Sequence, residues 1–469
     1  MNARRPGSAG GRLGVQPGAP RPRPPADPVR GVAFDALRAV REQDAYANLV
    51  LPGLLDAREL MPRDAAFATE LVYGTLRALG TYDAILTACV DRPLDKLDPL
   101  VLDVLRLGAH QLLATRVGAH AAVDESVKLA REKVGHGPAG LVNAVLRKVA
   151  SRDLASWTAE LAPPFEDDPI GHLALVHSHP RWIVDAFRDA LDGDLDETAA
   201  LLAADNERPT VTLVARPGRS DIDELLALGA QPGRWAPTAA VLESGAPSRL
   251  APVRDGRAGV QDEGSQLVAL ALANADLDGD DARWLDLCAG PGGKAALLGG
   301  LAVQRGARLL AAERQPHRAK LVRRAVGDTA DVVVADGTAP VWAPGSFDRV
   351  LVDVPCSGLG ALRRRPEARW RRQPTDLAGL RVLQAALLRS GIEAVRPGGL
   401  VAYVTCSPHR FETREVVDEV TATGIAVERI DVRGYLPGVP QLGAGPDVQL
   451  WPHRHGTDAM YLSLLRRLS

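Results

Sequence analysis

The sequence contains few cysteines, and those few are widely separated. The 469 residues include four, at positions 89, 288, 356 and 406, and no two of them form a Cys-x-x-Cys pair. This spacing argues against a zinc knuckle and against a small secreted domain held together by disulfides. We therefore expect a protein of a reducing compartment, the cytoplasm.

An excess of positive charge is also missing. Arg and Lys together number 56 against 58 Asp and Glu, which gives a formal net charge of -2 at pH 7. Without a global positive field, any binding of nucleic acid must come from local basic patches.

Long apolar runs are absent as well. No stretch approaches the length of a membrane-spanning helix, and the first residues lack the apolar centre of a signal peptide. We therefore expect neither a membrane contact nor secretion.

Apolar residues nevertheless make up 46% of the chain, enough for packed cores in two or three domains. Residues 1–30 are rich in Gly, Pro and Arg, and we interpret them as a flexible basic tail. Residues 31–152 carry apolar positions at helical spacing throughout, which predicts an all-α domain. Residues 153–255 have a mixed pattern, and we expect a small α+β connector there.

From residue 256 to 469, short β-rich runs alternate with helical ones. The predicted strands are Trp284–Leu287, Arg308–Ala312, Asp331–Ala335, Arg349–Val354 and Leu400–Cys406, with helices between them such as Pro316–Val326 and Asp376–Val395. This alternation predicts a parallel sheet with helices on both faces. Such sheets bind ligands at the carboxyl ends of their strands.

A glycine-rich turn follows the first predicted strand. Its sequence is Cys288-Ala289-Gly290-Pro291-Gly292-Gly293-Lys294. It fails as a Walker A loop, because Cys288 stands where Gly is needed and Ala295 where Ser or Thr is needed, and it fails as a dinucleotide Gly-x-Gly-x-x-Gly turn. Glu313 ends the second strand and Asp336 follows the third, positions suited to accept from ribose hydroxyls and from an adenine amino group. Together these loops predict a site for an adenosine-bearing ligand without phosphates.

Two of the four cysteines, Cys356 and Cys406, follow the fourth and fifth predicted strands. A free cysteine is usually a buried apolar filler, but two at one edge of a sheet favour chemistry. A thiolate that adds to carbon 6 of a cytosine activates carbon 5 for methylation, and a second thiol can then remove the proton at carbon 5. Asp353 is placed where a carboxyl group would assist the addition at ring nitrogen 3.

A basic segment follows the Cys356 loop. It contains Arg363, Arg364, Arg365, Arg369, Trp370, Arg371 and Arg372. Arginines interleaved with an aromatic ring are typical of a phosphate clamp with a stacking platform, although most charge runs are solvated surfaces. His409, His453 and His455 show no metal-ligand spacing, so we expect no metal.

These motifs resemble the NOL1/NOP2/Sun family of RNA cytosine-5 methyltransferases, and in particular its bacterial ribosomal-RNA members of the Sun, Fmu or RsmB type. The resemblance rests on Asp353-Val354-Pro355-Cys356 and Thr405-Cys406-Ser407 in that order, on the glycine-rich turn, on Gln261–Gln266 and on Trp451-Pro452-His453. It implies a Rossmann-like domain that uses S-adenosyl-L-methionine, with Cys406 as nucleophile and Cys356 as the residue that releases the product. It also implies cofactor contacts from Cys288, Ala289, Gly290, Pro291, Gly292, Gly293, Lys294, Glu313, Asp336 and Asp353. The sequence departs from the family pattern at Ala295, Val354, Glu313 and Ala459-Met460-Tyr461.

The helical region is similar to NusB-type RNA-binding domains, through Thr69–Arg77, Ala121–Val127 and Val142–Arg147. The pairing of domains implies methylation of an unpaired cytosine in small-subunit ribosomal RNA by a protein that we expect to be monomeric. Three alternatives stay open: a non-catalytic RNA-binding or ribosome-assembly factor, a cytosine-5 enzyme acting on transfer RNA, and a methyltransferase of another class. Cys406→Ala would separate the last of these, because an amino-directed enzyme needs no cysteine pair.

Overall fold

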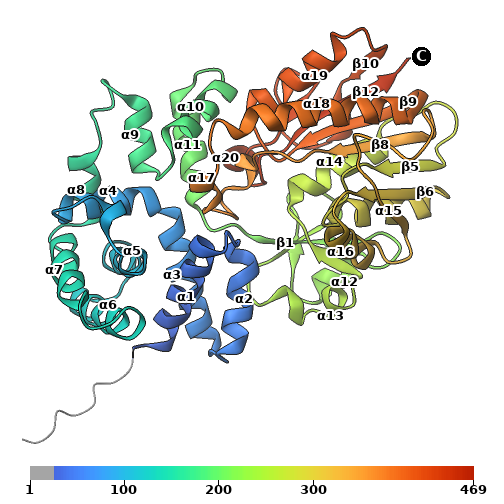
Figure 1. Ribbon diagram of the computed structural model, residues 1–469. Coiled ribbons are helices and arrows are strands. Elements are labelled where there is room, and N and C mark those ends of the chain that lie inside the picture. Colours follow the sequence, from blue (N-terminus) through green and yellow to red (C-terminus); the bar gives the residue numbers. More distant parts are fainter. Residues whose placement is uncertain (1–25, 469) are drawn as a thin grey trace, which may run out of the picture.

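The computed structural model describes residues 26–468. A helical domain and an α/β domain lie side by side, joined by three helices and a small sheet (Figure 1). Most of the predicted basic tail therefore falls outside the described residues. The chain is already helical at Pro28, since the Asp27 side chain accepts a hydrogen bond from the Val29 amide and caps the first helix.

The first domain consists of eight helices. They are α1 (Pro28–Glu42), α2 (Ala47–Ala57), α3 (Pro62–Arg77), α4 (Leu79–Cys89), α5 (Pro99–Ala114), α6 (Ala119–Lys133), α7 (Ala139–Val149) and α8 (Leu154–Leu161). Helix α5 starts as α1 does, with an Asp cap followed by a Pro in the first turn, where no amide hydrogen is needed. One core joins all eight helices and includes Phe34, Tyr82, Cys89 and Trp157. The α8 segment thus belongs to the helical domain, although it lies in the predicted connector.

The remaining connector residues form two structures. Helices α9 (Pro169–Val176), α10 (Arg181–Ala190) and α11 (Leu195–Asn206) share a core with Leu359, Leu362 and Trp451 of the α/β domain. A four-stranded antiparallel sheet follows, in the order β2 (Gln231–Pro232), β3 (Ala239–Leu242), β1 (Val211–Ala215), β4 (Ala258–Val260), with α12 (Ile222–Ala227) and α13 (Ala251–Arg254) beside it.

The α/β domain is built on a sheet with strand order β10-β12-β9-β8-β5-β6-β7, to which β11 adds by pairing with β12. Its strands are β5 (Arg283–Asp286), β6 (Arg308–Glu313), β7 (Ala330–Val334), β8 (Phe347–Asp353), β9 (Val395–Thr405), β10 (Val427–Ile430), β11 (Val448–Gln449) and β12 (Tyr461–Arg467). The helices are α14 (Glu263–Asn274), α15 (Gly293–Gln304), α16 (Pro316–Val326), α17 (Ala368–Arg371), α18 (Asp376–Ala394), α19 (Arg414–Thr421) and α20 (Pro452–His455). Strands β5 to β9 are parallel, as predicted, whereas β10, β11 and β12 are antiparallel additions that the sequence pattern did not indicate.

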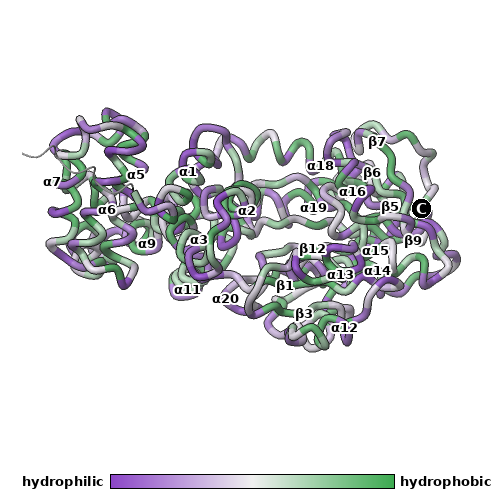
Figure 2. The backbone as a smooth tube through the Cα atoms, turned by 90° about the horizontal axis from the view of Figure 1, so that it is seen from below, coloured by the Kyte–Doolittle hydropathy of each residue, from purple (hydrophilic) through white to green (hydrophobic). Residues whose placement is uncertain are grey.

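Separate cores cover the two faces of this sheet. Helices α14 and α15 pack on one face around Trp284 and Leu297, and α18 and α19 pack on the other around Leu388 and Tyr403. Hydrophobic and hydrophilic residues alternate along the tube in Figure 2, as expected for amphipathic elements. Within residues 26–468, no helix is long and apolar enough to cross a membrane.

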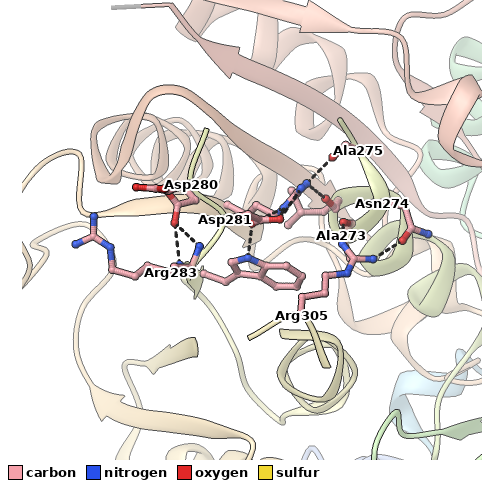
Figure 3. A network of polar contacts seen from close by, with 12 residues as sticks. Ala273, Asn274, Ala275, Asp280, Asp281, Arg283 and Arg305 are labelled. Atoms are coloured by element: carbon pink, nitrogen blue, oxygen red, sulfur yellow. Dashed lines mark hydrogen bonds and ion pairs between the residues drawn. The ribbon is translucent and has the colours of Figure 1, made fainter. Parts of the chain in front are cut away.

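Arginines close the amino-terminal edge of the sheet. Arg349, at the start of β8, pairs with Asp281 at 2.9 Å and donates to the carbonyls of Leu272 and Ala275, and Trp284 donates its indole hydrogen to the same Asp281 (Figure 3). Arg305 reaches the Ala273 carbonyl and the Asn274 side chain. These contacts hold the amino-terminal edge together, and ligands of parallel sheets bind at the opposite, carboxyl edge.

Candidate active site

A cavity of about 560 Å³ opens at the carboxyl ends of β5, β6, β8 and β9. Its wall includes Cys288, Gly290, Pro291, Lys294, Glu313, Asp336, Asp353, Cys356, Arg364, Arg365, Arg372 and Cys406 from the predicted site residues. Ala289, Gly292 and Gly293 belong to the same turn, but their side chains or Cα atoms do not line the cavity. The wall also includes Tyr46 of the helical domain, which no sequence motif indicated.

The glycine-rich turn fits closely against its neighbours. A Cβ atom on Gly290 would lie 2.0 Å from Glu313 Oε2, and one on Gly292, where φ is +113°, would lie 2.7 Å from the Ala325 side chain. Glycine is therefore required at Gly292, where the backbone conformation is left-handed and α16 leaves no room for a side chain, whereas a side chain at Gly290 would displace the Glu313 carboxylate. The turn leads into α15, whose first residue is Gly293 and whose second, Lys294, lines the cavity.

Three carboxyl groups face this turn. Burial raises the pKa of Asp286 to about 8, and the nearby Asp353 adds to the shift. One oxygen of Asp286 accepts from the Cys288 amide at 3.3 Å, while the other is buried without a partner. Glu313 accepts from the Gln315 amide at 2.8 Å, and hydrogen bonds from Thr338 lower the pKa of Asp336. A partnerless buried oxygen beside a glycine cradle, with two more acceptors, fits a nucleoside with hydroxyl and amino donors.

The two cysteine sulfurs meet across adjacent parallel strands. Asp353 at the end of β8 is paired in register with Val404 of β9, so the loops that follow carry Cys356 and Cys406 to the same place. Their Sγ atoms lie 3.3 Å apart. The thiol of Cys356 lowers the pKa of Cys406 by hydrogen bonding, and Lys294 acts in the same direction, whereas burial and Asp353 oppose it.

The pair is electrostatically asymmetric. The hydrogen bond to Cys406 raises the pKa of Cys356 well above its ordinary value, and burial adds to this. Of the two sulfurs, Cys406 is therefore the one that ionises more readily. Lys294 is held beside them by Asp353 at 3.0 Å and Ser265 at 3.3 Å. Burial works against the charge on Lys294, but Asp353 outweighs it and raises the pKa of Lys294.

One buried carboxylate, Glu412, ties the two cysteine loops together. It accepts from the hydroxyl of Ser357 at 2.5 Å and from that of Ser407 at 2.7 Å, the residues that follow Cys356 and Cys406. It also accepts from the Ser357 amide at 2.8 Å and from Gln384 at 3.1 Å. Sequence reasoning missed Glu412; the only signal was the repeated Cys-Ser pair, which places two hydroxyls at equivalent positions.

The basic segment after Cys356 is largely structural, which corrects the expectation of a phosphate clamp. Arg369 is fully buried and donates to the backbone oxygens of Arg77, Ser178 and Asp205 and to the Asn206 side chain. A guanidinium that is fully buried in this way cannot contact RNA. It instead joins the helical domain to α11 and the α/β domain.

Other arginines of the basic segment are also paired with groups of the protein. Arg363 is buried against Asp262 and Asp458, and Arg364 pairs with the same two carboxylates at 2.6 and 3.0 Å. Arg371 donates to the backbone oxygens of Val40 in α1 and Ala45 in the α1–α2 loop, and Trp370 packs on Gly80 of α4. Among the predicted RNA contacts, only Arg365 and Arg372 keep nitrogens that face the cavity without a carboxylate, as far as residues 26–468 are concerned.

The three histidines considered as metal ligands in the sequence have hydrogen-bond partners within the protein. His453 lies 2.6 Å from Glu197, and His455 accepts from the Trp451 amide at 2.8 Å. The His409 ring accepts from the Phe411 amide at 3.1 Å. In the part of the chain that the structure describes, no group of His, Cys, Asp and Glu side chains is arranged to hold a metal ion.

Comparison with known proteins identifies relatives of both large domains. Residues 270–466 match the family model "16S rRNA methyltransferase RsmB/F", and residues 27–151 match the NusB family. The chain is 56% identical over 450 residues to a Mycobacterium tuberculosis protein whose name says methyltransferase and gives no substrate, covering 95% of this chain and 98% of that one. It is 31% identical over 454 residues to the probable ribosomal RNA small subunit methyltransferase B of Bacillus subtilis, covering 94% and 98%. The crystal structure of PH0851 superposes with a TM-score of 0.77 at 19% identity, covering 94% and 98%.

The fold and these matches define the class of protein: it is an S-adenosyl-L-methionine-dependent methyltransferase with an amino-terminal NusB domain. More particularly, the chain belongs to the RsmB/F family of 16S rRNA methyltransferases.

Proposed function

We propose that the protein methylates carbon 5 of a cytosine in small-subunit ribosomal RNA through a covalent bond between Cys406 and carbon 6. The observation that carries the proposal is the 3.3 Å contact between Cys356 and Cys406 at the edge of the cofactor cavity. Ribosomal RNA is the favoured substrate because the family model and the Bacillus subtilis relative both name small-subunit ribosomal RNA.

The first step is addition of Cys406. Its thiolate is favoured by the hydrogen bond from Cys356. As the carbon–sulfur bond forms at carbon 6, electrons move through the ring toward nitrogen 3, where the Lys294–Asp353 pair supplies a proton. The product is an enamine whose carbon 5 is nucleophilic. The cytosine has to leave its stack to reach the thiolate, so an unpaired base is the expected target.

S-Adenosyl-L-methionine, when bound in the glycine cradle beside Glu313 and Asp336, supplies the methyl group that carbon 5 takes up. The protein must then remove the proton at carbon 5. Once Cys406 is a neutral thioether, the hydrogen bond and the negative charge that raise the pKa of Cys356 are gone. Cys356 can therefore lose its proton to water and act as the base.

The release step breaks the bond between Cys406 and carbon 6. The Cys356 thiolate takes the proton from carbon 5, the electrons of that bond form the carbon 5–carbon 6 double bond, and Cys406 departs as a thiolate. Ring nitrogen 3 returns its proton to the Lys294–Asp353 pair, and the two sulfurs are then in their starting states, Cys406 as thiolate and Cys356 as thiol. The asymmetry of the pair supports attack by Cys406 and release by Cys356.

The proposal is tested by transfer of labelled methyl groups to small-subunit ribosomal RNA, followed by digestion to nucleosides. We expect label in 5-methylcytidine with the wild type and none with Cys406→Ala. Cys89→Ala, which removes a buried cysteine of the helical domain, is the matched control and should keep activity. Label in another nucleoside, or activity that survives in Cys406→Ala, would rule out this chemistry; label only in transfer RNA would rule out the substrate.

A second variant isolates the release step. Cys356→Ala leaves the attacking thiolate but removes the base, so it should accumulate a protein–RNA adduct that survives denaturation. The adduct is measured as a band of reduced mobility in denaturing gels after incubation with cofactor and RNA. Equal amounts of adduct in Cys356→Ala and wild type would contradict the assignment of Cys356.

A further inference from the structure

Tyr46, a residue of the helical domain, forms part of the wall of the cavity. It is the residue before α2, and its ring lines the same space as Cys356 and Cys406. Its position is fixed by flanking contacts: the Ala47 amide donates to Glu367 at 2.9 Å, and Arg371 donates to the Ala45 carbonyl at 2.6 Å. The ring is thus held by residues from both domains rather than by its own helix alone.

Arg365 lies against this ring. Its guanidinium carbon is 4.8 Å from the centre of the Tyr46 ring, and its side chain is exposed. Within residues 26–468 the Arg365 guanidinium makes no hydrogen bond or ion pair, although its charge acts on the nearby Glu367 carboxyl, whereas Arg364 is neutralised by Asp262 and Asp458. Stacking on an aromatic face holds the guanidinium in place and leaves its hydrogen-bond donors free.

Arg372 reaches the same wall from the other end of the basic segment. Its Nε donates to the carbonyl of Ser357 at 3.1 Å, directly after Cys356. No carboxylate pairs with Arg372 in the described chain, and its terminal nitrogens are left for a ligand. Two guanidinium groups in the wall of one cavity, neither of them ion-paired within residues 26–468, are suited to bind an anion.

We propose that Tyr46, Arg365 and Arg372 form a subsite for the RNA backbone phosphate next to the target nucleotide. The inference rests on the proposed function, since a cytosine that enters the cavity leaves its flanking phosphates at the mouth, where these side chains lie. Arg365 and Arg372 contact the phosphate, and Tyr46 acts as a positioning residue for Arg365. The helical domain thereby takes part in the active site itself.

The test measures binding of a short, fluorescently labelled single-stranded oligocytidylate at several salt concentrations, with S-adenosylhomocysteine present. Arg365→Ala should weaken binding about tenfold. It should also lower the slope of log K against log salt by about one phosphate contact. Tyr46→Ala should do the same to a smaller degree, whereas Tyr46→Phe keeps the ring and should match the wild type. Arg308→Ala, an exposed arginine at the amino end of β6, is the matched control and should change neither quantity.

A neutral backbone shows whether a phosphate is the partner. An oligocytidylate with one methylphosphonate linkage beside a cytosine should bind the wild type more weakly, and Arg365→Ala should cause no further loss with it. The subsite would be overturned if Arg365→Ala bound the oligocytidylate as Arg308→Ala does. It would also be overturned if the loss of affinity from Arg365→Ala added fully to the loss from the methylphosphonate. Since binding is measured without turnover, a lowered salt slope without any 5-methylcytidine would leave the subsite standing and overturn the proposed function. If the wild type forms 5-methylcytidine but Arg365→Ala leaves the salt slope unchanged, the proposed function stands and the subsite is overturned.

Discussion

Asp286 is a carboxyl group that the fold holds in its protonated form. It ends β5, is almost fully buried, and has a pKa of about 8 because of burial and the neighbouring Asp353. A buried acid without a full set of partners is costly to ionise. Its second oxygen is available to a ligand that offers a hydrogen-bond donor or acceptor, which suits the cofactor cradle beside it.

This carboxyl group predicts a pH dependence of stability. The pKa of Asp286 is raised on folding, so the unfolded chain binds fewer protons than the folded one between about pH 4 and pH 8. The contribution of Asp286 is therefore fully present below pH 4 and is lost as the pH rises through 8. Asp286→Asn cannot ionise, so its free energy of unfolding should increase relative to wild type from pH 5 to pH 8. Urea unfolding of both proteins without cofactor measures this difference; a difference that does not vary with pH would contradict the assignment.

At the scale of elements, the catalytic cavity depends on loops that touch each other. Gly360, in the turn after Cys356, donates its amide to the Cys406 carbonyl at 2.9 Å and accepts from the Ala459 amide at 2.8 Å. Three loops, which follow β8 and β9 and precede β12, are therefore joined at one residue. A Cβ atom there would lie 2.1 Å from the Ala459 carbonyl oxygen.

Gly360→Ala should consequently move the Cys356 loop away from Cys406. We expect a loss of about 1–3 kcal/mol in the free energy of unfolding, typical of an overpacked site. Methyl transfer should fall more than tenfold, because the sulfur–sulfur contact is broken. Gly379→Ala in α18 is the control, since a Cβ there meets nothing within 4 Å. Chemical denaturation and the methyl-transfer assay compare the two; equal activities would show that the loops tolerate the displacement.

The parallel strands and the meeting of the two cysteines could be predicted from the sequence, because both follow from local pattern and from one topological rule. Strands rich in β-branched residues alternate with helices, and parallel strands end at one edge, so Cys356 and Cys406 had to come close. Strand β12 was missed because nothing local shows that Tyr461–Arg467 pairs antiparallel with β9. The contacts of Arg369 and Tyr46 could not be predicted from the sequence either, because each depends on how segments about 300 residues apart in the chain pack together. A run of arginines looks the same whether it faces solvent or a carbonyl-lined junction.

At the scale of the whole molecule, the helical and α/β domains share one junction. Trp370 of α17 lies on Gly80 of α4, where a Cβ atom would be 2.3 Å from the indole ring. The Gly80 amide donates to Ser178 at 2.9 Å, which adds the segment between α9 and α10 to the same contact. Tight packing of this kind couples the unfolding of neighbouring domains.

Gly80→Ala should loosen the junction without disturbing the cofactor cradle. We expect calorimetry to show two separated unfolding transitions in place of a coupled one, reduced methylation of ribosomal RNA, and unchanged binding of S-adenosylhomocysteine. Gly140→Ala in α7, where a Cβ meets nothing within 4 Å, should behave as the wild type. Coincident transitions together with full activity in Gly80→Ala would show that the domains work independently.

The buried Arg369 fixes the spacing between the helical domain and the α/β domain. Its guanidinium is shared by Arg77 of the helical domain, by Ser178 and by α11, so the distance from the NusB domain to the sulfur of Cys406 is fixed by the protein. Under the proposed function, an RNA that contacts the helical domain would present to Cys406 only the nucleotide at that span, so the choice of target would depend partly on length.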